Sequence, residues 1–492
     1  MTLGNLLKKI DIAVSHADLD AEITDVCHDS RKVKQGNLFV AVRGYESDGH
    51  DFIPAAIANG ATVILCEEPP EADIPYVVVS DTRRALALVS AEWFGNPAEK
   101  LKIIGVTGTK GKTTVTTLLK EVLETITGKP VGLVGTIHNM IGKRSLHTER
   151  TTPESRELQE LFAQMVEAGC EYCVMEVSSH ALVLDRVYGV TFEVGVFTNL
   201  THEHLDFHKT MEEYRRAKSL IFAQSKVGIV NLDDDAAAAI IDEAKCPVRT
   251  FAIAHDDADL VAKRIKLQPA SVEFLALTTG ELRQINLQIP GIFSVCNALA
   301  VIATLRALGY GTEQTADALA QCGGVKGRAE VVPTGADFTV VIDYAHTPDS
   351  LEKIITAVRE GTHGRVITLF GCGGDRDKTK RRIMGEIAVD LSDFTVVTSD
   401  NPRTEEPSAI IENILAGMVG VKKASYTVIE NRRDAIRWTL EHAKTGDTII
   451  LAGKGHETYQ EIGKEKLHFD EREVVREVML DINKQSNKET AQ

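Results

Sequence analysis

The chain has 492 residues, of which 43% are hydrophobic and 26% charged, and its formal net charge is −16. This length predicts two to four domains, because it is too great for one compact core. The negative charge argues against nucleic acid or an anionic membrane as the main partner, and no apolar run is long enough to span a bilayer.

The first segment, residues 1–98, mixes short strands with one clear helix. Apolar runs predict strands at 37–44, 61–68 and 74–81, and the stretch "FIPAAIANG" predicts a helix at 52–60. The Asn-Pro step in "FGNPAEK" breaks regular structure, so we place a boundary near residue 98. The N-terminus lacks the cleavage site of a signal peptide, and we therefore expect a cytoplasmic protein with reduced cysteines.

The second segment, residues 99–325, alternates continuously apolar strands with helical stretches. The expected strands are "KIIGVTG", "VGLVGTI", "YCVMEVSS", "VGVFTNL" and "VGIVNLD". Such strands are typical of a parallel sheet that helices cover on both faces. Cys170 and Cys173 run directly into one of these strands, so we expect buried thiols there, not a redox or zinc motif.

The third segment, residues 326–492, begins after the glycines of "CGGVKGR". The same alternation restarts there, with strands at "FTVVIDYAH", "RVITLFG", "FTVVTSD" and "DTIILAG". The chain as a whole is therefore predicted to be an α/β protein of three domains. Nearly every rare polar cluster directly follows a strand, and the carboxyl ends of strands are where open α/β sheets bind ligands. We expect two facing crevices with an active site between them.

The stretch "IIGVTGTKGKTTVTTLLKEVL", residues 103–123, predicts a strand, a glycine-rich loop and a helix. Backbone N–H groups of such a loop and the N-terminus of the helix can surround a phosphate. Lys112 could then reach the terminal phosphates, and the Thr113 hydroxyl could bind magnesium. The spacing departs from the usual GxxxxGK[ST], whose first glycine would fall at Val106.

Two further side chains, Glu176 and His204, are candidates for a magnesium site, whereas Lys218 taken by itself is typical of a solvated charge. Glu176 stands at a strand end, His204 lies in the polar cluster "NLTHEHLDFH", and Lys218 shares a helix face with Tyr214 at i, i+4 spacing. Magnesium requires oxygen ligands, which a lysine does not supply by itself.

Nine motifs, taken together and in order, resemble the Mur ligase family. They are "GVTGTKGKTT", "TTPES", "MEVSSHAL", "NLTHEHLDFH", "YRRAKSLIF", "DYAHTPDS", "GCGGDRDKTKR", "DNPR" and "GKGHE". The resemblance covers almost the whole chain. It implies a small α/β UDP-binding domain at 1–98, a central P-loop ATPase domain with a parallel sheet at 99–325, and a Rossmann-like α/β domain that binds an amino acid at 326–492.

The family's reaction is ATP-driven amide formation in peptidoglycan precursor synthesis. The resemblance implies that a carboxylate of UDP-N-acetylmuramoyl-L-alanyl-D-glutamate attacks the γ-phosphate of ATP. An amine then displaces phosphate from the resulting acyl phosphate. Both steps gather negative charge between anionic reactants, so positioned cations and Mg²⁺ would stabilise them.

The resemblance also implies roles for residues of the nucleotide site. Catalytic roles fall to Lys112, Glu176, His204 and Lys218, and the magnesium ligands would be Thr113, Glu176, His204 and Lys218, with a CO2-derived carbamate on Lys218. The residues expected to bind ATP are Gly108, Thr109, Lys110, Gly111, Lys112, Thr113, Thr114, Asn297, Arg328, Asp343 and His346. Because some of these belong to the third segment, we expect domain closure to complete the site.

Two substrate sites follow in the same way. The residues expected to bind the UDP-muramoyl-dipeptide are Ser30, Tyr45, Thr151, Thr152, Ser178 and Arg186. Those expected to bind the incoming amino acid are Arg381, Asp400, Asn401, Pro402, Arg403, Gly453 and Glu457. Arg403 offers a planar fork for a carboxylate, which meso-diaminopimelate carries at its far end and L-lysine lacks, so we predict meso-diaminopimelate.

Three positions depart from the family's usual residues. Lys110 stands where Asn is common, Glu203 where Asp is common, and Ala329 where a larger residue is usual. Three other functions remain open: the lysine-adding ligase, the more distant folylpolyglutamate synthase, and a nucleotide-dependent switch without ligase activity. A switch would not need the second set of arginines that follows the later strands. We further expect a monomer that is not inserted in a membrane.

Overall fold

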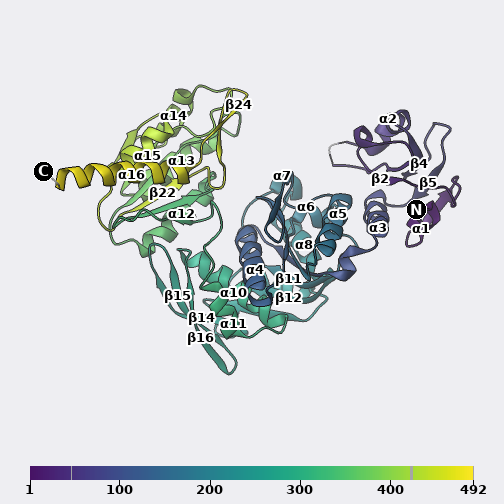
Figure 1. Ribbon diagram of the computed structural model, residues 1–492, viewed down its shortest axis with the longest axis horizontal. Coiled ribbons are helices and arrows are strands. Elements are labelled where there is room, and N and C mark those ends of the chain that lie inside the picture. Colours follow the sequence, from purple (N-terminus) through teal and green to yellow (C-terminus); the bar gives the residue numbers. More distant parts are fainter. Residues whose placement is uncertain (46, 422–424, 491–492) are drawn as a thin grey trace. The chain divides into compact units, whose positions relative to one another are not determined.

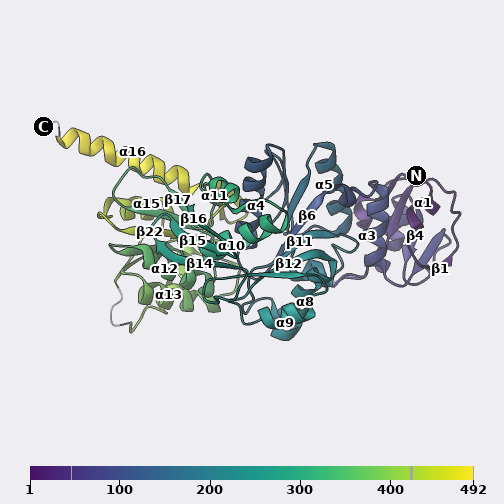
Figure 2. The same cartoon turned by 90° about the horizontal axis from the view of Figure 1, so that it is seen from below.

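The structure is a computed structural model that describes residues 1–45, 47–421 and 425–490, with side chains up to residue 484 (Figures 1 and 2). The chain forms two compact units. The first consists of Met1–Val261 and Leu299–Ala318, and the second of Ala262–Ala298 and the chain from Leu319 onward. The boundaries that we place near residues 98 and 325 stay predictions.

The N-terminal part of the first unit is a five-stranded sheet in the order β1-β5-β4-β3-β2, in which only β1 is antiparallel to its neighbour. Its elements are α1 (Leu3–Leu7), β1 (Ile12–Ser15), β2 (Asp25–Cys27), β3 (Asn37–Val40), α2 (Ile53–Ala58), β4 (Ala61–Cys66), β5 (Tyr76–Val79) and α3 (Thr82–Trp93). Leu38 and Val40 pack on one face with α1 and α3, whereas Phe39 packs on the other with α2. Residues of a strand alternate between faces, so both faces are buried.

Helix α3 was not expected, because sequence analysis predicted one helix in this segment. Asp81 marks its start: the Asp81 side chain accepts hydrogen bonds from the backbone N–H groups of Arg83 and Arg84. This N-cap is the local signal that could have identified the helix.

The central part of the first unit is built on parallel strands in the order β13-β12-β11-β6-β10-β7, followed by antiparallel β8 and β9. The strands are β6 (Lys102–Thr107), β7 (Gly132–Val134), β8 (Asn139–Ile141), β9 (Arg144–Leu146), β10 (Tyr172–Glu176), β11 (Phe192–Phe197), β12 (Ser225–Asn231) and β13 (Val248–Ala252). The helices are α4 (Lys112–Thr127), α5 (Ser155–Glu167), α6 (Ser179–Val183), α7 (Leu205–His208), α8 (Met211–Ser219) and α9 (Ala237–Glu243). The five predicted strands correspond to β6, β7, β10, β11 and β12.

Strand β14 (Leu260–Leu267) leads into a hairpin of β15 (Val272–Thr278) and β16 (Glu281–Leu287), and the helices α10 (Ile292–Ala307) and α11 (Thr312–Leu319) follow. These three strands were not predicted. Lys263, Arg264 and Lys266 interrupt β14. In β15, buried residues alternate with the more accessible Glu273, Leu275 and Leu277, so neither strand is the continuously buried apolar run that is easiest to recognise.

The C-terminal sheet of the second unit has the order β17-β18-β22-β19-β20-β21, with β17 antiparallel and the others parallel. Its strands are β17 (Glu330–Val332), β18 (Thr339–Asp343), β19 (Val366–Phe370), β20 (Phe394–Val397), β21 (Tyr426–Val428) and β22 (Thr448–Ala452), and a separate hairpin joins β23 (Tyr459–Ile462) to β24 (Glu465–His468). The helices are α12 (Pro348–Gly361), α13 (Thr379–Leu391), α14 (Pro407–Leu415), α15 (Arg432–Glu441) and α16 (Glu471–Thr490). Both views show α16 leading from this sheet to the end of the chain (Figures 1 and 2).

The mixed sheets with their helices confirm the α/β class and the predicted strand-helix alternation. Cys170 and Cys173 are buried and unpaired, as expected, and burial raises the pKa of both thiols. Within the described ranges, no helix combines the length and the apolar character that crossing a membrane would require.

Candidate active site

The predicted phosphate loop lies between the sheet strand β6 and the first turn of α4. Gly108 has a φ of +148°, and a Cβ at this position would lie 1.9 Å from Thr198 Oγ1, so only glycine fits. Lys112 Nζ donates hydrogen bonds to the carbonyl oxygens of Gly108 (2.8 Å) and Thr109 (3.0 Å). The loop therefore holds its own lysine at the helix N-terminus, the position that favours an anion.

The segment after β11 holds this loop in place. The backbone N–H of Lys110 donates to Asn199 Oδ1 (2.8 Å), and the Thr198 hydroxyl donates to the Lys110 carbonyl (2.7 Å). Lys110 Nζ also lies 3.4 Å from a carboxylate oxygen of Glu203. The two departures from the family pattern at this site thus form an ion pair with each other.

Lys218 is almost fully buried on α8, with 1% of its surface exposed. Its Nζ lies 4.4 Å from the centre of the Tyr214 ring, and it makes no hydrogen bond within the described residues. Burial, followed by the charge of Lys112, holds the pKa of Lys218 well below its ordinary value of 10.5. This shift favours the uncharged form of the amine, which is the nucleophilic form.

A group of aromatic and histidine rings extends from Tyr214, the ring that Lys218 contacts. The centre of the Tyr214 ring lies 4.9 Å from that of His208 and 6.1 Å from that of His204. The His180 ring lies 5.1 Å from His204 and 4.2 Å from Phe207. Burial lowers the pKa of all three histidines, and that of His208 falls to about 4, so the rings are neutral at neutral pH. A neutral imidazole is the form that can bind a metal.

Glu176, at the end of β10, is 1% exposed and lies against Thr136. One carboxylate oxygen accepts from the Thr136 N–H (2.9 Å) and the other from its hydroxyl (3.0 Å). Thr152 donates its hydroxyl hydrogen to the Glu176 carbonyl (2.9 Å), and the hydroxyls of Thr136 and Thr151 are 3.0 Å apart. Thr151 and Thr152 thus connect the "TTPES" loop to the end of β10. They do not cap α5, whose N-cap residue is Glu154.

The surroundings of Glu176 suit a magnesium ion that a nucleotide helps to hold. No group of three or more His, Cys, Asp or Glu side chains in the described part of the chain is arranged to hold a metal alone. Magnesium is commonly bound by one or two protein carboxylates together with substrate phosphates. Each Glu176 oxygen accepts one hydrogen bond and keeps a lone pair for a cation.

A cavity of about 790 Å³ lies in the first unit, between residues of the N-terminal sheet and of the central part. Ser30, Tyr45 and Arg186 from the predicted dipeptide site line it. Arg186 also donates to the Thr152 carbonyl (3.1 Å), and the Ser178 N–H donates to the Thr152 hydroxyl (3.1 Å). The structure therefore brings the six predicted residues into one connected region.

Sequence reasoning assigned no role to several other residues of this cavity. They are His28, Asp29, Arg31, Arg83, Arg150, Glu154, His180, Asp206 and Phe207. Glu154 lies 2.9 Å from Arg186, 2.7 Å from Arg150 and 3.7 Å from Arg83. Three guanidinium groups around one carboxylate leave excess positive charge, which suits an anionic ligand despite the net charge of the chain.

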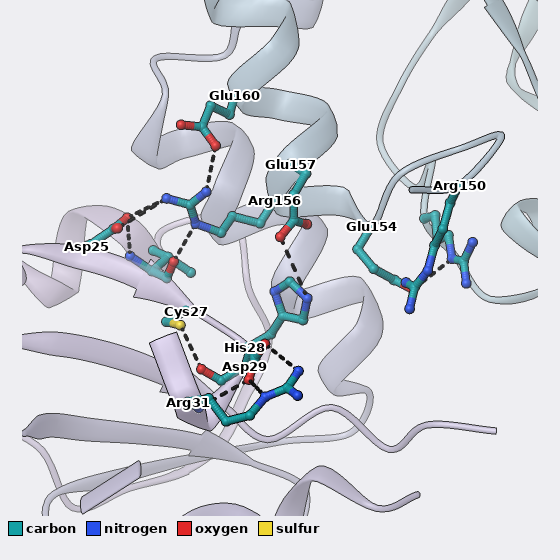
Figure 3. A network of polar contacts seen from close by, with 12 residues as sticks. Asp25, Cys27, His28, Asp29, Arg31, Arg150, Glu154, Arg156, Glu157 and Glu160 are labelled. Atoms are coloured by element: carbon teal, nitrogen blue, oxygen red, sulfur yellow. Dashed lines mark hydrogen bonds and ion pairs between the residues drawn. The ribbon is translucent and has the colours of Figure 1, made fainter. Parts of the chain in front are cut away.

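Charged contacts between α5 and the N-terminal sheet line a second cavity, of about 470 Å³. Figure 3 shows Arg156 between Asp25 and Glu160, with its guanidinium 3.1 Å from the first carboxylate and 2.8 Å from the second. His28 lies opposite Glu157 in the same view, at 3.9 Å. These contacts hold the segment His28–Arg31 against α5, the helix that follows the "TTPES" loop.

The remaining ATP candidates belong to the second unit. The Arg328 guanidinium lies 5.2 Å from the centre of the Tyr344 ring, and His346 Nδ1 lies 2.8 Å from the Tyr344 carbonyl. Asp343 accepts a hydrogen bond from the Ala329 N–H (2.7 Å), which holds Ala329 at a positive φ of 45°. Arg328, Asp343 and His346 thus form one group, and Asn297 is a residue of α10.

The predicted amino-acid site is a buried polar cluster at the carboxyl ends of β20 and β22. Asn401 Nδ2 donates to Glu457 (2.9 Å), and Lys454 Nζ donates to both Asn401 Oδ1 (3.1 Å) and Glu457 (3.1 Å). Lys454 is fully buried, and no role was assigned to it from the sequence. Gly453 has a φ of +115°, and a Cβ there would lie 2.6 Å from an Asp400 carboxylate oxygen.

The two candidate arginines of this site have different surroundings. Arg381 is 1% exposed and donates to both oxygens of Glu405 (2.8 and 3.0 Å), which favours a supporting position beneath the site over direct substrate contact. Arg403 is partly accessible, and its Nε donates to Glu461 (2.7 Å).

Sequence families match the chain in three consecutive ranges. The Mur ligase family catalytic domain matches residues 22–94, the Mur ligase middle domain residues 106–305, and the Mur ligase glutamate ligase domain residues 327–455. A UDP-N-acetylmuramoyl-L-alanyl-D-glutamate–2,6-diaminopimelate ligase from Clostridium acetobutylicum is 47% identical over 486 residues, covering 98% of this chain and 100% of that protein. A ligase of the same name from Caldanaerobacter subterraneus is 47% identical with the same coverage.

The chain is also similar to solved structures of Mur ligases. The structure of a UDP-N-acetylmuramoyl-L-alanyl-D-glutamate–2,6-diaminopimelate ligase superposes with a TM-score of 0.77 at 30% identity, covering 98% of this chain and 99% of the other. A MurF ligase from Thermotoga maritima, solved in complex with ADP, has a TM-score of 0.59 at 20% identity, covering 96% of this chain and 99% of the other, and shares the fold.

Proposed function

This chain belongs to the Mur ligase family, and from that premise we propose that it adds meso-diaminopimelate to UDP-N-acetylmuramoyl-L-alanyl-D-glutamate. The reaction uses ATP and releases ADP and phosphate. Relatives that match the chain over its whole length carry this activity in their names. A nucleotide-dependent switch would not account for a second buried polar cluster in the other unit.

The observation that carries the amino-acid assignment is the partly accessible Arg403 within the cluster of Asn401, Lys454 and Glu457. A guanidinium can bind the distal carboxylate of diaminopimelate through two charge-assisted hydrogen bonds. The Glu457 carboxylate can accept from the distal ammonium. L-Lysine carries the distal ammonium but lacks the distal carboxylate, so it would bind Glu457 and not Arg403.

The residues of the first unit would bring the dipeptide carboxylate to the phosphates. The arginines around Glu154 would bind the UDP-linked dipeptide in the cavity, and the loop around Lys112 would bind the β- and γ-phosphates. Lys112 would exchange its hydrogen bonds with Gly108 and Thr109 for the negative charge that the acyl phosphate step develops. Arg328, Asp343 and His346 would reach the nucleotide after closure of the second unit and exclude water.

Magnesium would be held by Thr113, Glu176, His204 and a carbamate on Lys218. Bound there, it would neutralise phosphate charge during transfer. A carbamate forms when an uncharged amine attacks CO2 and loses a proton, and the depressed pKa of Lys218 supplies that uncharged amine. The modification would convert a buried base into an anionic oxygen ligand. We also propose that the enzyme acts as a monomer in the cytoplasm.

The decisive experiment measures ADP release by the purified enzyme with ATP, Mg²⁺ and the UDP-linked dipeptide. Release should require an amino acid, and meso-diaminopimelate should exceed L-lysine in kcat/KM by roughly a hundredfold or more, because a site built for a polar group rejects the analogue that lacks it. Comparable turnover of L-lysine would favour the lysine-adding ligase. ADP release that ignores the amino acid would favour the switch.

A further inference from the structure

The hairpin of β23 and β24 lies against the "DNPR" motif through both backbone and side chains. The Arg403 N–H donates to the Glu461 carbonyl (3.1 Å), and the Arg403 carbonyl accepts from the Gly463 N–H (2.8 Å). Asn401 Oδ1 accepts from the Glu461 N–H (3.0 Å), and Gln460 Nε2 donates to the Asp400 carbonyl (2.6 Å). The hairpin therefore holds three of the four residues of the motif.

Arg403 is also fixed at two points of its guanidinium. Nε donates to Glu461 Oε2 (2.7 Å) and Nη1 donates to the Gly374 carbonyl (2.8 Å). Within the described ranges, Nη2 makes no hydrogen bond. Two fixed donors define the plane of the guanidinium and leave donors for a further carboxylate.

Glu461 is partly buried, ionised and fixed in position, as expected of a residue that stays paired with Arg403. It is only partly exposed, and its second oxygen lies 3.3 Å from Lys466 Nζ. Burial alone would raise the pKa of the Glu461 carboxyl, but Lys466 and Arg403 hold that pKa below its ordinary value, so the group is ionised at neutral pH. Its backbone N–H, bound to Asn401, fixes the position from which the side chain extends.

We propose that Glu461 is a positioning residue for selectivity: it orients Arg403 so that the free donors of the guanidinium meet the distal carboxylate of the amino acid. This inference rests on the proposed function, because it takes Arg403 as the group that binds this carboxylate. The hairpin is thereby part of the amino-acid site. If Glu461 instead competed with the substrate carboxylate for Arg403, its removal would lower KM for diaminopimelate. The positioning role and the competing role therefore predict opposite changes in KM.

The test is a double-mutant cycle of Glu461→Gln and Arg403→Ala, measured in the full-length enzyme with meso-diaminopimelate, L-lysine and ATP as varied substrates. Glu461→Gln should raise KM for diaminopimelate about tenfold, leave KM for ATP unchanged and lower the preference over L-lysine, since a neutral amide orients the guanidinium less strongly. In the Arg403→Ala background the same substitution should have no further effect. Glu465→Gln, at an exposed position of the same hairpin, is the matched control and should match the wild type.

The outcomes distinguish the positioning role of Glu461 from the proposed function of the enzyme. If Arg403→Ala raises KM for diaminopimelate and Glu461→Gln does not, or lowers it, the positioning role is wrong and the proposed function stands. An effect of Glu461→Gln that persists without Arg403 also overturns the positioning role. If Arg403→Ala leaves KM unchanged, both proposals fail at this site. Should Glu461→Gln lose its cooperative unfolding transition, Glu461→Asp replaces it in the cycle and should raise KM by a smaller factor.

Discussion

Lys218 Nζ lies 4.4 Å from the centre of the Tyr214 ring, where burial holds the pKa of the amine well below its ordinary value. A buried amine with no hydrogen-bond partner among the described residues has a cost that stability alone does not explain. The carbamate that we propose would explain why a lysine, and not an apolar side chain, occupies this position.

Replacing Lys218 by Met should abolish most of the activity, by about a hundredfold or more, because no carbamate oxygen can form. Wild-type activity should fall in CO2-free buffer and recover with bicarbonate, whereas Lys218→Met should not respond. Short carboxylates should partly restore Lys218→Ala. Full activity of Lys218→Ala would show that the carbamate assignment is wrong.

The same residue predicts a pH dependence of stability. The pKa of Lys218 is lower in the folded chain than its ordinary 10.5, so in CO2-free buffer the unfolded chain binds this proton more tightly. The stability of the wild type relative to Lys218→Met should therefore rise as pH approaches 10.5. Denaturant unfolding of both proteins between pH 7 and pH 10.5 measures this difference.

A methyl group at Gly108 should disable the phosphate loop, because it would lie 1.9 Å from Thr198 Oγ1. Gly108→Ala should weaken ADP binding at least tenfold, measured by calorimetry, since the loop must shift away from its anion-binding form. Gly128→Ala is the control: Gly128 has a φ of +66° at the other end of α4, but nothing lies within 4 Å of the added carbon. It should cost about 1 kcal/mol of stability and leave ADP affinity unchanged. Equal ADP affinities of both variants would contradict this account.

The buried ion pair of Arg432 and Glu471 should stabilise the amino-acid site. Arg432 donates to Glu471 (2.8 Å), to the Ala452 carbonyl (2.9 Å) and to the Ser399 carbonyl (3.4 Å), so it joins α16 to the ends of β20 and β22. Glu471→Gln should lower the free energy of unfolding by up to about 3–5 kcal/mol, because it removes the hydrogen-bonded carboxylate of a buried guanidinium and leaves only Asp400, at 3.9 Å, as a counter-charge. Denaturant unfolding of the full chain provides the measurement.

The neighbouring Arg433 is the control for this experiment. It is half exposed and pairs with Glu477 at the surface. Arg433→Gln should change stability by less than about 1 kcal/mol. If Arg433→Gln lowered the free energy of unfolding as much as Glu471→Gln, burial would not determine the stability lost when an ion pair is broken.

His208 should make the first unit sensitive to acid. Burial is the main cause that lowers the pKa of His208 from 6.5 to about 4. Because the unfolded chain binds the proton first, stability should fall as pH drops from about 6.5 to about 4. His208→Gln, whose amide can replace the contact of Nε2 with Ser179 Oγ (2.8 Å), should reduce this loss by at most about 3 kcal/mol.

The exposed His468 is the matched control for the acid experiment. Glu473 raises the pKa of His468, so His468→Gln should not reduce the loss of stability between pH 6.5 and pH 4. Thermal unfolding at several pH values compares the three proteins. An unchanged acid dependence of His208→Gln would contradict a depressed pKa at this site.

The five predicted strands of the central sheet and the phosphate loop could be recognised from the sequence, because a continuous apolar run and a strand-glycine-helix pattern are local signals. The half-buried β14–β16 strands and helix α3 were missed. Lys454 and Glu461 were missed for another reason: each is an ordinary charge in sequence, and only its contact with the "DNPR" residues reveals a role.

The pair of Lys110 and Glu203 illustrates the same limit. Taken separately, they are two unexplained departures from a family pattern, 93 residues apart in the chain. Folding places their charged groups 3.4 Å apart beside the phosphate loop, and the departures become one interaction. A single sequence contains no information on which distant charges will meet.

By itself, the sequence determined the α/β class, the strand ends that carry polar clusters and the family to which the motifs belong. These properties depend on residue type and short spacing, which physical chemistry constrains locally. Only the tertiary structure decided which arginines share Glu154, how deeply Lys218 is buried and which carboxylate holds Arg403. Charge pairing and desolvation depend on distances of a few ångströms between segments that are far apart along the chain.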